Sequence, residues 1–173
     1  MGNHLNDLPP ETVQLTALQS LDLDYNNLNP LPSEIWKLTA LKWLFVAGNQ
    51  LSALPADVGQ MKALQSLDIG ENRLRELPAE LGQLTALEAL DVRANRLTEF
   101  PLVICQLTML QQLYLSNNQI AELPSEIGRL KALQSLFISG NQLHRLPSEL
   151  IQLTALKTFD VEGNPVSVLP TEI

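Results

Sequence analysis

Apolar residues recur along the chain with a fixed spacing of 23 residues. Each copy follows the pattern LxxLxxLxLxxNxLxxLPxx(I/V/L)xx, as in Leu107, Leu110, Leu113, Leu115 and Asn118. Asparagines at 3, 26, 49, 72, 95, 118, 141 and 164, and prolines at 9, 32, 55, 78, 101, 124, 147 and 170, keep this spacing without an insertion. We therefore predict one domain over residues 1–173, with a half repeat at 3–14 followed by repeats starting at Leu15, Leu38, Met61, Leu84, Leu107, Leu130 and Leu153.

Each repeat contains one stretch typical of a strand and one typical of a short helix. In residues 18–23, Leu21 and Leu23 alternate with polar residues, so their side chains point to one side while Ser20 and Asp22 point to the other. The segment after each Leu-Pro, such as residues 32–38, has the spacing of one turn of 3₁₀ or α-helix with proline at its first position. Because one repeat buries too little apolar surface to fold alone, the repeats must stack on one another.

The shared pattern resembles the leucine-rich repeat family, and the LPSEIGRL segment at 123–130 is similar to the LPxxIGxL motif of its intracellular 23-residue class. That class includes Ras-suppressor and scribble-type scaffolds and the repeat arms of bacterial Roco GTPases and kinases. The resemblance implies an α/β fold, a right-handed solenoid shaped as a horseshoe arc. A parallel β-sheet would line its concave side, with short 3₁₀ or α segments on the convex side, and its general role would be protein binding.

The repeated asparagines are expected to be structural. An asparagine side chain can bond backbone groups around a turn, and a buried column of them would satisfy amides and carbonyls that the strands leave unpaired. Because the same residue stands in every repeat, this column could not discriminate between ligands. The predicted structural ladder consists of Asn26, Asn49, Asn72, Asn95, Asn118, Asn141 and Asn164.

Residues that vary between repeats at the exposed strand positions are the candidates for binding a partner. Five of the eight aromatic residues (two Trp, two Tyr and four Phe) fall there, and Trp and Tyr are typical anchors of interfaces. An alternative remains that Tyr114 beside Phe137 only stabilises the sheet. The predicted binding residues are Tyr25, Trp43, Phe45, Tyr114, Phe137, Asp22, Asp24, Asp68, Asp91, Arg93 and Asp160.

Charge indicates the kind of partner. The chain carries a formal charge of −8, with a pI near 4.7 and no basic block, which argues against nucleic acid. Eight acidic residues and three basic ones are expected on the concave face, which favours a protein partner with a basic and apolar surface. The sequence contains no run of 18 apolar residues, so it predicts no membrane span. A single cysteine, Cys105, and a start that does not resemble a secretory signal favour the cytoplasm.

The sequence gives no sign of enzymatic chemistry. The phosphate-binding motifs GxxxxGK and GxGxxG and the nucleophile motif GxSxG are absent, and neither His4 nor His144 has metal ligands at a suitable spacing. Asp68 and Asp91 are expected to face each other across adjacent strands as a solvated acidic pair. We therefore predict no catalytic residue, metal site or cofactor, and a binding protein rather than an enzyme.

Two further interpretations remain open at this stage. The chain starts inside a half repeat and stops at the apolar Ile173, so we expect either a piece of a larger protein or ends covered by self-association. In the first case the repeats would be the sensing or substrate-recognition arm of a Roco GTPase, a kinase or a bacterial effector. In the second they would be a self-assembling structural repeat. Trp36, Cys105 and Ile151, which replace a repeated glycine, are expected to pack partly on the convex side.

Overall fold

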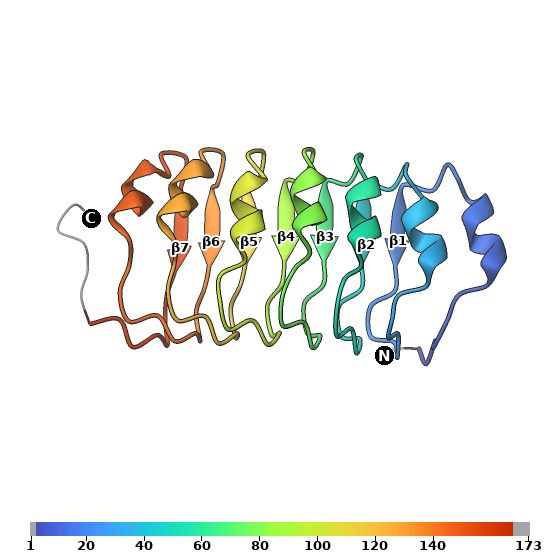
Figure 1. The fold of residues 1–173 in the computed structure, drawn as a ribbon, viewed down its shortest axis with the longest axis horizontal. Coiled ribbons are helices and arrows are strands. Elements are labelled where there is room, and N and C mark those ends of the chain that lie inside the picture. The colour runs from blue at the N-terminus through green and yellow to red at the C-terminus, as the bar shows by residue number, and fades with distance from the viewer. Residues whose placement is uncertain (1–2, 168–173) are drawn as a thin grey trace.

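The computed structural model describes residues 3–167, so Pro170 and Ile173 of the repeat pattern lie outside it. Within this range, seven short 3₁₀ helices alternate with seven three-residue strands (Figure 1). The helices are η1 (Pro10–Gln14), η2 (Ser33–Lys37), η3 (Ala56–Gln60), η4 (Ala79–Gln83), η5 (Leu102–Gln106), η6 (Ser125–Arg129) and η7 (Ser148–Gln152). The strands are β1 (Ser20–Asp22), β2 (Trp43–Phe45), β3 (Ser66–Asp68), β4 (Ala89–Asp91), β5 (Gln112–Tyr114), β6 (Ser135–Phe137) and β7 (Thr158–Asp160).

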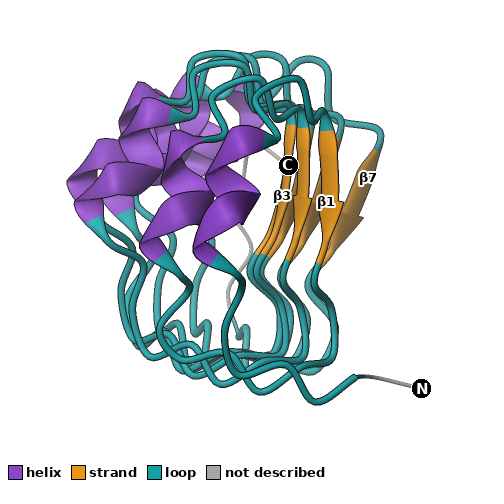
Figure 2. Cartoon of the chain, turned by 90° about the vertical axis from the view of Figure 1, so that its right-hand side faces the viewer, coloured by secondary structure: helices purple, strands orange, loops and turns teal. Residues whose placement is uncertain are grey.

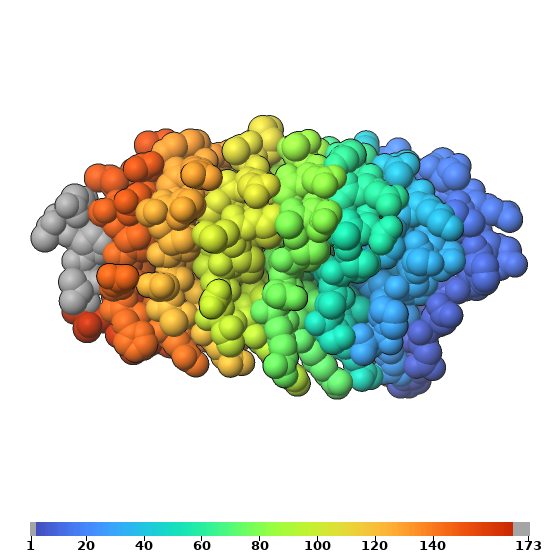
Figure 3. Space-filling view, in the orientation of Figure 1, coloured from blue at the N-terminus to red at the C-terminus, as the bar shows by residue number. Residues whose placement is uncertain are grey.

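The strands of the described range form one parallel sheet in the order β1 to β7. Each strand pairs with the next in the register of the repeat, so that Leu21 lies opposite Leu44 and Leu44 opposite Leu67. Seen along the stack, the helices lie on one side and the strands on the other (Figure 2). The repeats follow one another as bands along the long axis (Figure 3). The predicted α/β solenoid is confirmed, and we call the solvent-facing side of its sheet the concave face.

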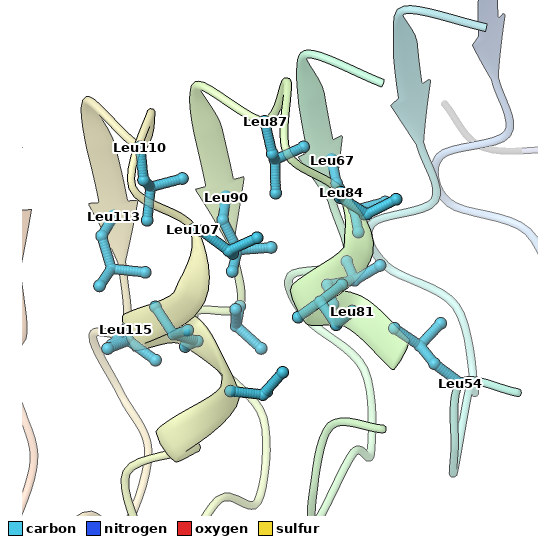
Figure 4. Close-up of a cluster of buried hydrophobic side chains, with 14 of the residues drawn as sticks. Leu54, Leu67, Leu81, Leu84, Leu87, Leu90, Leu107, Leu110, Leu113 and Leu115 are labelled. Atoms are coloured by element: carbon cyan, nitrogen blue, oxygen red, sulfur yellow. The ribbon is translucent and has the colours of Figure 1, made fainter. Parts of the chain in front are cut away.

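Leucines fill the space between the two layers. Leu67, Leu90 and Leu113 from successive strands are at most 1% exposed, and they point toward Leu84 and Leu107, which follow the helices (Figure 4). A repeat thus shares its buried surface with the repeats before and after it. This sharing is what makes stacking obligatory for units that cannot form a core alone.

The helices begin one residue later than the sequence predicted. From η2 onward, proline is the residue before the helix rather than its first residue, and its carbonyl accepts the first 3₁₀ bond, as in Ile35 N to Pro32 O at 3.1 Å. Proline suits this position because its φ is fixed and it needs no backbone donor. In η1 the repeated Pro9 likewise precedes the helix, and a second proline, Pro10, is the first helical residue.

The repeated asparagines lie where the strands end. The Oδ1 of Asn49 accepts the backbone N–H of Leu28 at 3.0 Å, and its Nδ2 donates to the carbonyls of Leu23, Val46 and Ala47 at 3.0 to 3.1 Å. The six ladder asparagines from Asn26 to Asn141 are 6–7% exposed. Each one therefore ties its own turn to the preceding repeat.

The residue before each ladder asparagine has a left-handed backbone. Glycine fills this position in three repeats, and four other residue types fill it elsewhere, at φ from 49° to 58°. The glycines are Gly48, Gly140 and Gly163, and the others are Tyr25, Glu71, Ala94 and Asn117. The shared conformation turns the chain out of the sheet at the same place in every repeat, which keeps the exposed columns in line.

Candidate functional site

Two columns of side chains cross the concave face. They come from the first and third residues of each strand, which point away from the leucine core. The first column reads Ser20, Trp43, Ser66, Ala89, Gln112, Ser135 and Thr158, and the second reads Asp22, Phe45, Asp68, Asp91, Tyr114, Phe137 and Asp160. Of the predicted binding residues, Trp43 and every member of the second column therefore share one continuous surface.

The first aromatic group is the pair Trp43 and Phe45 on β2. The indole of Trp43 is 39% exposed, and Lys42 Nζ lies 5.9 Å from the ring centroid. Phe45 is half-buried between its column neighbours Asp22 and Asp68. Two large rings on one strand, with carboxylates on either side, give an apolar patch with an acidic rim.

The second aromatic group is the stacked pair Tyr114 and Phe137 on β5 and β6. The ring centroids are 5.0 Å apart and the planes differ by 2°. The Tyr114 hydroxyl donates to Oε1 of Gln112 at 3.1 Å. Parallel stacking places the two rings face to face, an arrangement that stabilises the sheet and also presents an apolar surface.

Tyr25 lies beyond the strand columns, at the turn that follows β1. Its ring covers Gly48 of the next repeat, and its hydroxyl donates to Oε1 of Glu71 at 3.2 Å, two repeats away. The hydrogen bond to Glu71 raises the pKa of the Tyr25 hydroxyl. Since the side chain is still 52% exposed, it offers a third aromatic contact surface at the edge of the concave face.

The aspartates of the second column cap backbone groups, which the sequence analysis missed. Oδ1 of Asp68 accepts the N–H of Gly70 at 2.9 Å, and Asp22, Asp91 and Asp160 make the same contact two residues on. If the hydrogen bonding between strands continued past β3, the N–H of Gly70 would donate to the carbonyl of Val46. That carbonyl already accepts the side-chain amides of two ladder asparagines, Asn49 and Asn72. The aspartates therefore satisfy the donors that the asparagine ladder leaves free.

Asp24 makes the equivalent contact across repeats. The unit that carries Phe45 has no aspartate in the second column, and there Oδ1 of Asp24 accepts the N–H of Ala47 at 2.7 Å. Partial burial raises the pKa of Asp24. The sequence did contain a sign of this capping role: every position of the second column that is not aromatic is an aspartate.

Asp68 and Asp91 are register partners in the middle of the concave face. The expectation of a solvated pair was wrong. The Asp91 side chain is 12% exposed, and burial raises its pKa to about 6, while burial also raises the pKa of Asp68. Arg93 Nε lies 3.1 Å from Asp91 Oδ2 and opposes this shift. Neighbouring side chains therefore cover much of both carboxylates, although both still line the hollow described next.

This central hollow has a volume of about 270 Å³ and joins the two aromatic groups. Phe45 and Tyr114 stand on either side of it, and the small residues Ser66 and Ala89 leave the space open. Its remaining lining residues are Leu67, Asp68, Asp91, Arg93 and Gln112. Within residues 3–167, no three His, Cys, Asp or Glu side chains are grouped so that they could hold a metal ion. The aromatic rings and the two carboxylates that line the hollow are suited to contact with apolar groups and with cations.

Stacked parallel strands on one side, short helices on the other and an asparagine at every turn define a solenoid of leucine-rich repeats. Family models agree: a leucine rich repeat model matches residues 1–51, 47–97 and 62–120, and a leucine-rich repeat region model matches residues 105–173. The chain belongs to the leucine-rich repeat family. No match was found among curated proteins.

Solved structures with the same fold include proteins from bacteria and from a plant. A leucine-rich repeat protein of Leptospira interrogans is 33% identical, with a TM-score of 0.86 over 99% of this chain and 50% of that one. An internalin of Listeria monocytogenes is 29% identical, with a TM-score of 0.81 over 94% of this chain and 46% of the other. The ectodomain of the Arabidopsis thaliana receptor kinase GASSHO1/SCHENGEN3, in complex with CASPARIAN STRIP INTEGRITY FACTOR 2, is 33% identical, with a TM-score of 0.85 over 96% of this chain and 21% of that one.

The chain thus spans half or less of each of these structures. Members of this family are in general protein-binding modules, and one of the three structures holds a bound partner. Among residues 3–167, no helix has the length and hydropathy needed to cross a bilayer.

Proposed function

We propose that the chain is a protein–protein interaction module that binds its partner on the concave face. The observation that carries this proposal is the placement of Trp43, Phe45, Tyr114 and Phe137 on one continuous sheet surface. Aromatic side chains of this kind supply most of the binding energy in many interfaces, particularly where polar residues surround them. The complex of a similar plant ectodomain with its factor supports a recognition role for such a solenoid.

The partner presents a basic and apolar surface. Four aspartates share the second column with the aromatic residues: Asp22, Asp68, Asp91 and Asp160. Arg93 forms an ion pair with one of them, Asp91. Capping of backbone donors fixes the carboxylates in place, so they need little reorganisation when a cation approaches. Association is therefore faster at low salt, since screening weakens the attraction.

The role we propose for this binding is scaffolding or signalling inside the cell. The LPxxIGxL motif at residues 123–130, typical of the intracellular class, supports this, as does the single cysteine of the chain, Cys105, which is buried and free. Self-association through the repeat stack is a separate proposal, and light scattering across a concentration series tests it, because a constant monomer mass would overturn it.

The test of the concave site starts from affinity capture, using the wild type against a variant with Trp43, Phe45 and Phe137 changed to alanine. For a partner retained only by the wild type, Phe45→Ala or Phe137→Ala should each cost about 2 kcal/mol or more, about 30-fold in Kd, with folding retained. Ile151→Ala is the matched control, because this side chain is 58% exposed on the helical side of the repeat. Unchanged affinity in both phenylalanine variants would refute the concave site.

A second candidate is that the module is the recognition arm of a larger enzyme, such as a Roco GTPase, a kinase or a bacterial effector. The plant structure described above, an ectodomain of a receptor kinase of which this chain matches 21%, supports this proposal. The reading frame beyond residue 173 tests it directly. A catalytic domain encoded there would support the proposal. A stop codon directly after residue 173, with no catalytic domain encoded upstream of the repeats either, would overturn it.

A further inference from the structure

The repeat that contains η5 is more apolar than the other repeats at several positions. The first turns of the other six helices carry an acidic residue, whereas η5 carries none and has Val103 at that position. Leu102 stands where five of the others have serine or alanine, and Phe100 stands where a leucine precedes the proline elsewhere. Met109 replaces a repeated alanine. All of these changes add apolar volume.

Burial separates changes that fill the core from those that do not. Val103 is 9% exposed and Cys105 is 2% exposed, so both pack inside the stack. Leu102 is 58% exposed, although the equivalent residues of neighbouring units are small or polar. Single exposed apolar side chains are common on protein surfaces, and Ile151 is also 58% exposed, so the exposure of Leu102 gains its significance from the hollow beside it.

Leu102 borders a hollow of about 590 Å³ between the segments that lead into η5 and η6, outside the two strand columns. Phe100 and Leu123, each 6% exposed, are its apolar floor, and Ala121 and Pro124 extend that floor. The volume lies in the range of about 300–1,000 Å³ that is usual for sites of small ligands and single anchoring groups. We call it the η5–η6 hollow; it is a separate place from the central hollow of the concave face.

The rim of the η5–η6 hollow is acidic. Glu99 and Glu122 both line it, and Arg145 Nη2 lies 3.2 Å from Oε2 of Glu122. This ion pair is weak because its side chains are 76% and 67% exposed. Glu99 makes no ion pair with any residue in the described part of the chain, so its carboxylate is free to receive a cation. An apolar floor beside a free carboxylate fits an apolar group with a positive charge next to it.

We propose that the η5–η6 hollow is a second docking site, which takes one bulky apolar side chain of an extended partner segment, with an adjacent lysine or arginine against Glu99. Leu102 and Phe100 contact the apolar side chain, and Glu99 selects the basic neighbour. This site does not depend on the concave face, so a partner could bind both surfaces or only one. The charge of −8 on the whole chain favours a basic segment here as well.

The test uses an acetylated and amidated peptide, Gly-Lys-Phe-Lys-Gly, titrated into the full chain labelled with ¹⁵N. We expect shifts of the backbone signals of Leu102, Ala121 and Leu123, saturating at millimolar peptide. The same peptide with alanine in place of phenylalanine should not saturate, and the one with glutamates in place of lysines should bind several-fold more weakly. Shifts centred on the strands, or equal binding by all three peptides, would overturn the proposal.

Repeats of the same chain provide matched variants. Leu102→Ser together with Phe100→Leu introduces the residues that the units of η2, η6 and η7 carry, so the fold is retained. This variant should bind the peptide about fivefold or more weakly, close to 1 kcal/mol. Glu99→Gln should weaken binding of the Lys-Phe-Lys peptide, and the control Ile151→Ala, on the helical side of another repeat, should leave its affinity unchanged. Unaltered affinity in the Leu102/Phe100 variant would overturn the site, and a loss caused by Phe45→Ala would assign the binding to the concave face instead.

Discussion

Removal of one central ladder asparagine tests what holds the repeats together. Asn95 donates to the carbonyls of Ile69, Val92 and Arg93 at 3.0 to 3.2 Å and accepts the N–H of Leu74 at 2.9 Å. In Asn95→Ala the three carbonyls keep other donors, but the buried Leu74 N–H is left without a partner. Such a stranded donor costs about 1–3 kcal/mol, and the lost bonds add to this cost, so we expect a loss of about 3 kcal/mol.

Urea unfolding followed by circular dichroism measures this loss in the free energy of unfolding. The slope m should be close to that of the wild type, because a large fall in m would mean that the stack has separated into two units. Asn164→Ala is the control: this asparagine is only half-buried, and its removal should cost clearly less. A loss below about 1 kcal/mol for Asn95→Ala, at unchanged m, would refute the structural role of the ladder.

Three more predictions concern single side chains. The folded pKa of Asp91 lies near 6, above the usual 3.8, so between these values the native state binds more protons than the unfolded state, and this group makes the protein less stable as the pH rises from about 4 to 6. Asp91→Asn should reduce this loss of stability by roughly 1–2 kcal/mol, after allowance for screening, when urea unfolding is compared at pH 4 and pH 7. An equal loss of stability in the variant and the wild type would contradict the burial of this carboxylate. Gly48→Ala would force a Cβ into the Tyr25 ring at a φ of +62°, so thermal unfolding should occur several degrees lower, whereas an equal Tm would show that the ring does not lie there. Burial raises the pKa of Cys105 to about 11, so a thiol reagent should label the native protein far more slowly than the protein in denaturant, and equal rates would exclude a buried thiol.

The 23-residue spacing was sufficient to predict the strands and their register, because the position of a residue within its repeat decides which way its side chain points. Leu44, Leu67 and Leu90 are buried as the alternation requires, and Phe45 lies opposite Asp68. The start of the helices was predicted less well. Proline satisfies both the first helical position and the position before it, so its presence could not distinguish between them.

Contacts between different repeats were beyond the sequence argument. Asp68 is half-buried beside its register partners Phe45 and Asp91, and Tyr25 donates to Glu71, which lies 46 residues further along the chain. Neither fact follows from a pattern that treats the repeats as equal. The convex replacements show the same limit. Trp36 and Cys105 are 3% and 2% exposed and so pack more completely than expected, whereas Ile151 is 58% exposed and packs only in part. Another helix follows those that carry Trp36 and Cys105, whereas within residues 3–167 none follows η7, which carries Ile151.

Hydrogen–deuterium exchange on the captured complex tests the proposed function most directly. Amides of β2 through β6 should exchange more slowly in the complex than in the free chain, with those of η1 to η4 unchanged. Slower exchange confined to the helices and their leading segments, with the strands as in the free chain, would contradict a partner seated against the inner wall of the solenoid.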